Sequence, residues 1–175
     1  MTSPTAPTAT LTRERADLLD ALTDHRHLLR RTLDGLSEAQ VRLRPTVSQL
    51  SLAGLVKHLA HTEERWQAFI VEGPSAMAMT EERYAAHAES FEPTPEETID
   101  VLLARFDATA ARTEELIRTL PDLDAAQPLP PAPWFDEDVQ WSARRVLVHI
   151  LAELTQHAGH ADILREAIDG QKTMG

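Results

Sequence analysis

The segment ELTQHAGHADILRE, residues 153–166, places several side chains able to bind a metal near the apolar face of one predicted helix. Glu153, His157 and His160 lie within it, and His149 lies one turn before it. Residues four apart on a helix are separated by about 6 Å along its axis, so Glu153 and His157 can bind one ion. His149 and His157, about 12 Å apart, cannot readily do so. The pairs 149/153, 153/157 and 157/160 remain open, and 153/157 points most directly inward.

A second candidate segment, HLAHTEERW, begins at His58. On its predicted helix His58 lies nearer the apolar stripe than His61, so His58 is the better inward-facing donor. His58, Glu153 and His157 together would supply three nitrogen or oxygen ligands and leave a metal position open. That arrangement is typical of a catalytic zinc rather than a structural one.

An ordinary structural role is the alternative for each of these residues. A single histidine on an apolar face is commonly a hydrogen-bonded core residue, and His25 is an example with no evident partner. A Glu–His pair four residues apart also forms a hydrogen bond on a helix surface. The chain contains neither an HExxH nor a Glu-x-x-His motif, so it lacks the signatures of zincins and of di-iron bundles. Spacing alone leaves both interpretations open.

Composition excludes several other functions. The chain has 175 residues, no cysteine and a formal net charge of −11. Without cysteine there is no disulfide, no thiolate-bound metal and no cysteine nucleophile. The acidic balance argues against nucleic acid or an anionic membrane as the main partner. No apolar run approaches the roughly 20 residues of a membrane span, and we expect a cytoplasmic protein.

The predicted fold class is all-α, a four-helix bundle with long connections. Four long segments have helical periodicity, and none alternates like a strand. They span residues 12–36, 51–73 (or from Ser48), 94–120 and 142–169, with Thr94 as N-cap and Pro95 at the first position of the third. A short turn capped by Ser37, a short helix near 81–87 and a proline-rich loop, PLPPAPWFDEDVQW, are expected between them. We predict a loose tail at 1–10 and a single domain at 11–175.

The segments SLAGLVKHLAHTEERW and PWFDEDVQWSARRVLVHILAELTQHAGHADILREAIDG, on this four-helix pattern, resemble the DinB-like superfamily. The likeness is strongest to its thiol-dependent branch, which includes mycothiol S-transferases and mycothiol-dependent maleylpyruvate isomerase. It covers nearly the whole chain after Thr10, and HAGHADILRE is its most specific part. The resemblance implies a four-helix bundle that holds a divalent metal, zinc or nickel, with three protein ligands.

The resemblance also implies roles for individual residues. The family's ligand on the second helix matches His58, and its pair on the last helix matches Glu153 and His157. Glutamate at 153 is similar to the isomerase-like members, whereas many relatives have histidine there. His61 and His149, with His160, would then support the ligands or line the substrate pocket.

Two functions from different classes follow. The first is a metal-dependent thiol S-transferase or thiol-dependent isomerase, in which a low-molecular-weight thiol such as mycothiol attacks an electrophilic substrate. Arg144 and Arg145, near the start of the last helix, are candidates for binding the thiol cofactor or an acidic substrate, and a solvated helix end is their alternative. The second function is a metal-binding scaffold or binding protein without catalytic activity. A homodimer is compatible with both.

Overall fold

The computed structural model describes residues 11–78, 80–131, 135 and 138–173. The predicted tail at 1–10 lies outside the described residues, as do parts of the predicted proline-rich loop. The elements of the structure are α1 (Arg13–Arg31), α2 (Glu38–Val41), α3 (Leu52–Glu72), η1 (Pro74–Met77), α4 (Glu81–Glu89), α5 (Ile99–Thr119), β1 (Ala126–Pro128), β2 (Gln140–Ser142) and α6 (Ala143–Asp169).

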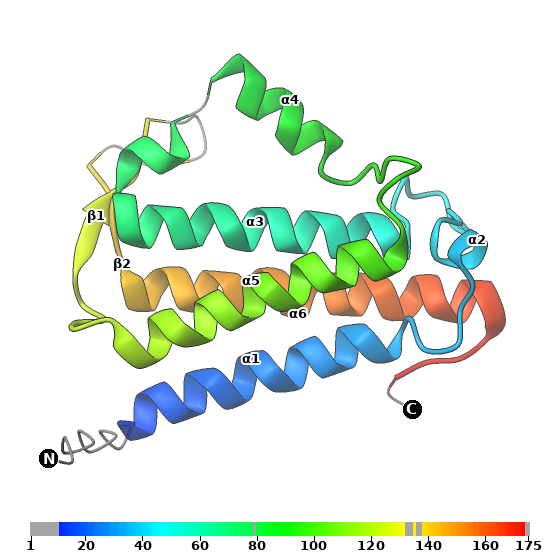
Figure 1. Ribbon diagram of the computed structural model, residues 1–175, viewed down its shortest axis with the longest axis horizontal. Coiled ribbons are helices and arrows are strands. Elements are labelled where there is room, and N and C mark those ends of the chain that lie inside the picture. Colours follow the sequence, from blue (N-terminus) through cyan, green and yellow to red (C-terminus); the bar gives the residue numbers. More distant parts are fainter. Residues whose placement is uncertain (1–10, 79, 132–134, 136–137, 174–175) are drawn as a thin grey trace, which may run out of the picture.

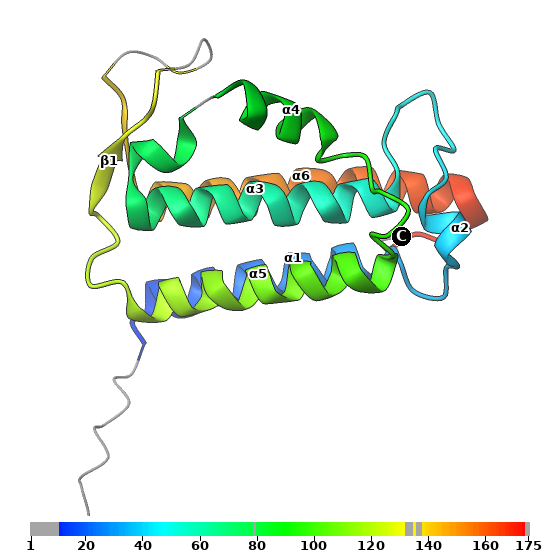
Figure 2. The same cartoon turned by 45° about the horizontal axis from the view of Figure 1, so that its top comes forward.

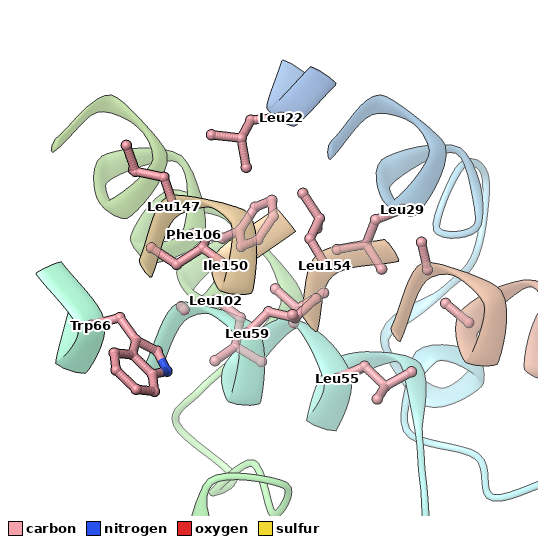
Figure 3. Close-up of a cluster of buried hydrophobic side chains, with 14 of the residues drawn as sticks. Leu22, Leu29, Leu55, Leu59, Trp66, Leu102, Phe106, Leu147, Ile150 and Leu154 are labelled. Atoms are coloured by element: carbon pink, nitrogen blue, oxygen red, sulfur yellow. The ribbon is translucent and has the colours of Figure 1, made fainter. Parts of the chain in front are cut away.

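The four long helices pack in two layers. α3 and α6 lie side by side in one layer, and α1 and α5 form the other (Figure 2). Apolar side chains from all four helices fill the space between the layers (Figure 3), including Leu22, Leu55, Phe106 and Leu147. The predicted all-α four-helix bundle is therefore confirmed.

Most helix ends follow the signals in the sequence. Ser51 caps α3 by accepting a hydrogen bond from the N–H of Gly54, and Ser142 caps α6 in the same way. Gly170 ends α6 in the left-handed conformation at φ 80°, which suits glycine because it has no Cβ. Ser37 forms a capping box at the short helix α2. These local contacts fix where α3 and α6, the two helices of the candidate site, begin and end.

The predicted start of the third long helix is wrong, because α5 begins four residues after Pro95. Its N-cap is Thr98, whose hydroxyl accepts a hydrogen bond from the N–H three residues later, rather than Thr94. Residues 94–97 form a turn closed by a bond from the Glu97 N–H to the Thr94 carbonyl. Arg42 donates to the carbonyls of Thr94 and Glu97, which a helix starting at Thr94 would use itself. A tertiary contact therefore overrides the local signal.

The connections contain more structure than periodicity predicts. β1 and β2 pair as a short antiparallel ribbon at one end of the bundle, although no strand was predicted. The predicted short helix is present as α4, which stands off from α3 on the outer side of the bundle (Figure 1). No helix in the described ranges has the length and apolar character needed to cross a membrane.

One ion pair lies inside the bundle. Arg26 of α1 donates to Glu63 of α3 over 2.5 Å, and their side chains are 7% and 5% exposed. Thr113 of α5 also donates to Glu63. Burial raises the pKa of the Glu63 carboxyl, while Arg26 and the Thr113 hydroxyl oppose that shift. These polar contacts connect three of the four long helices.

Candidate metal centre

Three side chains able to bind a metal meet between α3 and α6. His58 comes from α3, and Glu153 and His157 come from consecutive turns of α6. One ligand atom of each lies within 4.8 Å of the other two. Both histidines are buried and Glu153 is half-buried. The pair 153/157, favoured by helix geometry, thus faces the histidine that the resemblance selects.

The hydrogen bonds of His58 define which ring nitrogen is available. Its Nδ1 lies 2.9 Å from the hydroxyl oxygen of Ser90, and that hydroxyl donates its own proton to the His87 carbonyl. Ser90 therefore accepts from His58, which places the imidazole proton on Nδ1. The lone pair is then on Nε2, which lies 3.4 Å from the Thr62 hydroxyl oxygen and could bind a ligand in place of that contact. Burial, and then the nearby His157 and His87, lower the pKa of His58 to about 3. His58 is neutral at physiological pH, the form that binds metals.

Glu153 lies between two imidazoles. Its Oε2 is 3.6 Å from Nε2 of His157, and its Oε1 is 3.6 Å from Nε2 of His149. Contact with His157 lowers the pKa of Glu153 against the effect of burial. The carboxylate is therefore ionised at neutral pH and available as an oxygen ligand.

His160 contacts the far side of the His157 ring. The Nδ1 atoms of the two histidines are 3.3 Å apart, so one of them donates the proton that they share. With the proton on Nδ1 of His157, its Nε2 lone pair would face Glu153. Such a bond to the second ring nitrogen is the usual support of a histidine ligand.

The donor set fits a divalent metal such as zinc. Two imidazoles and one carboxylate match the ligands of catalytic zinc sites. Bond lengths of about 2.0–2.2 Å in a tetrahedral site place neighbouring ligand atoms roughly 3.4 Å apart. The 3.6 Å between His157 and Glu153 is close to that value, and small side-chain rotations would bring all three atoms to it.

A cavity of about 490 Å³ opens next to these residues. His58 and Glu153 line it, together with His149 and with residues of α4 and of the β1–β2 connection. Its size is in the range of small-molecule sites. The site thus has room for a ligand that reaches the donor atoms, as expected for a catalytic rather than a closed structural site.

The other predicted histidines lie in different surroundings. His149 packs edge-on against Trp66 and Trp141, with ring centroids 4.8 and 5.1 Å away. Burial, more than the charge of Arg65, lowers the pKa of His61. His61 lines a separate cavity of about 280 Å³ on α3, away from the three donors. His149 and His160 therefore contact the candidate ligands, whereas His61 does not.

The two arginines proposed for cofactor binding point to different neighbours. Arg144 forms ion pairs with Glu14 of α1 and with Asp124. Arg145 is exposed, and its guanidinium lies 4.2 Å from the centre of the Trp141 ring. Neither arginine lines the cavity beside the donors. Their role in binding a cofactor stays a prediction.

Two residues that contact the ring of His58 were not predicted from the sequence. Ser90 accepts its Nδ1 proton, and Phe91 stacks on its ring with centroids 3.8 Å apart. Both follow α4 in an irregular segment that has no periodicity to interpret. Gly54 is one signal: a Cβ there would collide with the carbonyl oxygen of Phe91, so the close approach requires glycine.

Comparisons with known proteins agree with this fold. A family model described as Mycothiol-S-transferase matches residues 17–170. A crystal structure of a conserved protein from Enterococcus faecalis is similar to this one with a TM-score of 0.64 at 15% sequence identity. The match covers 93% of this chain and 100% of that chain, and at this identity it concerns the fold alone. No curated protein matches the chain.

Proposed function

We propose that this chain, which belongs to the mycothiol-S-transferase family, is a metal-dependent enzyme that transfers a low-molecular-weight thiol to an electrophile. The observation that carries the proposal is the convergence of His58, Glu153 and His157 beside a cavity large enough for a substrate. A purely structural metal needs no such cavity.

The chain's own residues would hold the metal through Nε2 of His58, a carboxylate oxygen of Glu153 and a ring nitrogen of His157. When bound there, a divalent metal such as zinc or nickel lowers the pKa of a coordinated thiol from about 8.5 and makes a thiolate available at neutral pH. Ser90 fixes the ring of His58, and His160 contacts that of His157. His149 stands beside the second oxygen of Glu153 and limits its rotation.

The nucleophile has to come from outside the chain. The sequence contains no cysteine, so the sulfur would belong to a small thiol, and the family name makes mycothiol the first candidate. Such thiols are kept reduced in the cytoplasm, where we propose that the enzyme acts. The apolar walls of the cavity would exclude water from the reacting sulfur and protect the thiolate from protonation.

The test compares zinc-loaded with chelator-treated protein. Mycothiol, bacillithiol and glutathione are each offered with a panel of small, aromatic and acidic electrophiles, and adduct formation is followed by mass spectrometry. We expect mycothiol adducts to form faster than the uncatalysed reaction with zinc-loaded protein, and at the uncatalysed rate after chelation. No rate above background with any thiol and any electrophile would overturn the proposal. If chelation nevertheless lowered the melting temperature strongly, the scaffold function would replace it.

A further inference from the structure

The lining surface of the cavity beside the candidate metal centre is mostly apolar, although both polar and apolar residues contribute to it. His58 and Glu153 lie on its polar side, and its apolar residues are Trp66, Met77, Tyr84, Pro130 and Phe135. Among the described residues, two charged side chains line it, Arg65 and Glu153, and their charges are of opposite sign. A ligand that carries its own charge would lose hydration against the apolar part of these walls.

One wall is a fixed group of aromatic rings. Trp66 of α3, which lines the cavity, stacks nearly parallel on Trp141 of β2, which does not line it, with centroids 4.9 Å apart at 12°. His149 meets both rings edge-on, and Phe135 meets Trp141 edge-on at 6.0 Å. Trp66 is only 5% exposed. Rings packed this tightly do not rearrange to suit each ligand, so this wall presents a preformed aromatic surface.

The facing side comes from α4, which spans the outer side of α3 (Figure 1). Tyr84 and His87 of this helix line the cavity. Tyr84 is 47% exposed, although large aromatic side chains in a soluble bundle are usually buried. A ring bound between Tyr84 and the aromatic wall would cover the exposed surface of Tyr84, and offset or edge-to-face contacts between aromatic rings are favourable.

We propose that the electrophile taken by this site is an uncharged compound with an aromatic ring. This inference rests on the proposed function, because it assumes that the second substrate occupies the cavity next to the thiol. For an aryl enone, the thiolate sulfur forms a bond to the β-carbon while the carbon–carbon π bond breaks. The displaced electron pair passes to the carbonyl oxygen. The α-carbon then takes up one proton, which balances the proton that the thiol lost. No leaving group, oxidant or reductant is needed.

A binding experiment tests the ligand class without relying on catalysis. Benzylacetone is an unreactive, uncharged ketone with one ring; methyl propyl ketone lacks the ring, and the para-carboxylate of benzylacetone adds a charge. Each is titrated into zinc-loaded protein by calorimetry. We expect benzylacetone to bind about tenfold more tightly than either of the others. A preference below about threefold in either comparison, or tighter binding of the carboxylate, overturns the inference.

Variants locate the bound ring. Tyr84→Ala and Phe135→Ala should each weaken benzylacetone binding by about threefold to tenfold. The matched control is Val148→Ala on α6, which is 44% exposed and does not line the cavity; it should leave binding unchanged. Equal affinity in all three variants and the unmodified protein would place the ligand elsewhere and refute the inference.

A transfer experiment separates this inference from the proposed function. Mycothiol is reacted separately with benzylideneacetone, ethylideneacetone and the para-carboxylate of benzylideneacetone. For each enone, the reaction rate with the protein is divided by the rate without it. The aromatic uncharged enone should show the largest ratio. Equal ratios for all three overturn the inference and leave the proposed function standing. If benzylacetone binds preferentially but the protein transfers no thiol above the uncatalysed rate, only the proposed function is refuted. The cavity then remains a binding site for uncharged aromatic compounds.

Discussion

Replacing Glu153 by alanine tests the candidate metal centre most directly. Glu153 supplies one of three donor atoms that lie within 4.8 Å of one another, and it is the only anionic one. In the metal-free protein its removal should matter little, because a half-buried carboxylate beside imidazoles contributes at most about 1 kcal/mol. In the presence of zinc the difference should be large, because a three-ligand site depends on all its donors.

The size of the effect follows from linkage. Zinc that binds only the folded protein stabilises it by RT ln(1 + [Zn]/Kd), about 2.7 kcal/mol at one hundred times the Kd. If the loss of Glu153 weakens binding about 100-fold, the same zinc concentration contributes only about 0.4 kcal/mol. For a chain of this size each kcal/mol corresponds to roughly 2–4 °C in melting temperature. We therefore expect zinc to raise the melting temperature by about 5–11 °C in the unmodified protein and by about 1–2 °C in Glu153→Ala.

The assay combines thermal unfolding, with zinc and with chelator, and metal analysis of the dialysed protein. His58→Ala and His157→Ala should behave like Glu153→Ala. His61→Ala is the matched control for His58→Ala, because it removes an α3 imidazole that lines a different cavity, and it should keep the full zinc response. The ligand assignment is refuted if Glu153→Ala retains one zinc per chain while His160→Ala loses it.

Three further predictions concern the groups around the site and the core. Ser90→Ala removes the acceptor for Nδ1 of His58 and should weaken zinc binding about 10- to 100-fold with one equivalent still bound at saturation; unchanged zinc affinity in a titration would contradict it. Arg26→Met leaves the buried Glu63 carboxylate without its cation and should lower the free energy of unfolding by about 3–5 kcal/mol in urea, whereas adding Glu63→Leu to it should recover much of that loss. Glu38 accepts from the first N–H of α5, and that bond lowers its pKa, so its stabilising effect is present above its ordinary pKa of 4.5 and is lost as the pH falls through the lowered value. Unfolding curves of Glu38→Gln and the unmodified protein should therefore differ at pH 6 and converge in acid, and a constant difference would contradict this.

The parts of the site that lie on one helix could be predicted from the sequence. The spacing of Glu153 and His157 and the apolar stripe of α6 are local, so helical geometry alone selects that pair. His58 is different: its place at the edge of the apolar stripe does not predict a side chain that is 5% exposed. It is buried because Phe91, distant in sequence, lies over its ring. Periodicity ranked this residue above His61, and the resemblance identified it as a metal ligand.

Non-local contacts also explain what the sequence could not predict. The Thr94–Pro95 signal for a helix start is sound locally, but Arg42 binds the carbonyls that such a helix needs. Tyr84 and Phe135 of the cavity come from a short helix and from a connection, where there is no long apolar pattern to interpret. The cavity therefore becomes visible only once these segments are placed over the bundle.

The close approach of Gly54 to the Phe91 carbonyl has a consequence for how the site can change in evolution. Even an alanine at this position would push the 90–91 segment away, and with it the contacts that orient His58. Substitutions on that side of the cavity therefore disturb the donor atoms. Tyr84 and Phe135 line the cavity and have no contact with the three donors among those described, so their replacement changes the shape of the cavity and leaves the donors in place. New substrate preferences can thus accumulate at Tyr84 and on the β1–β2 connection while the metal-binding residues stay the same.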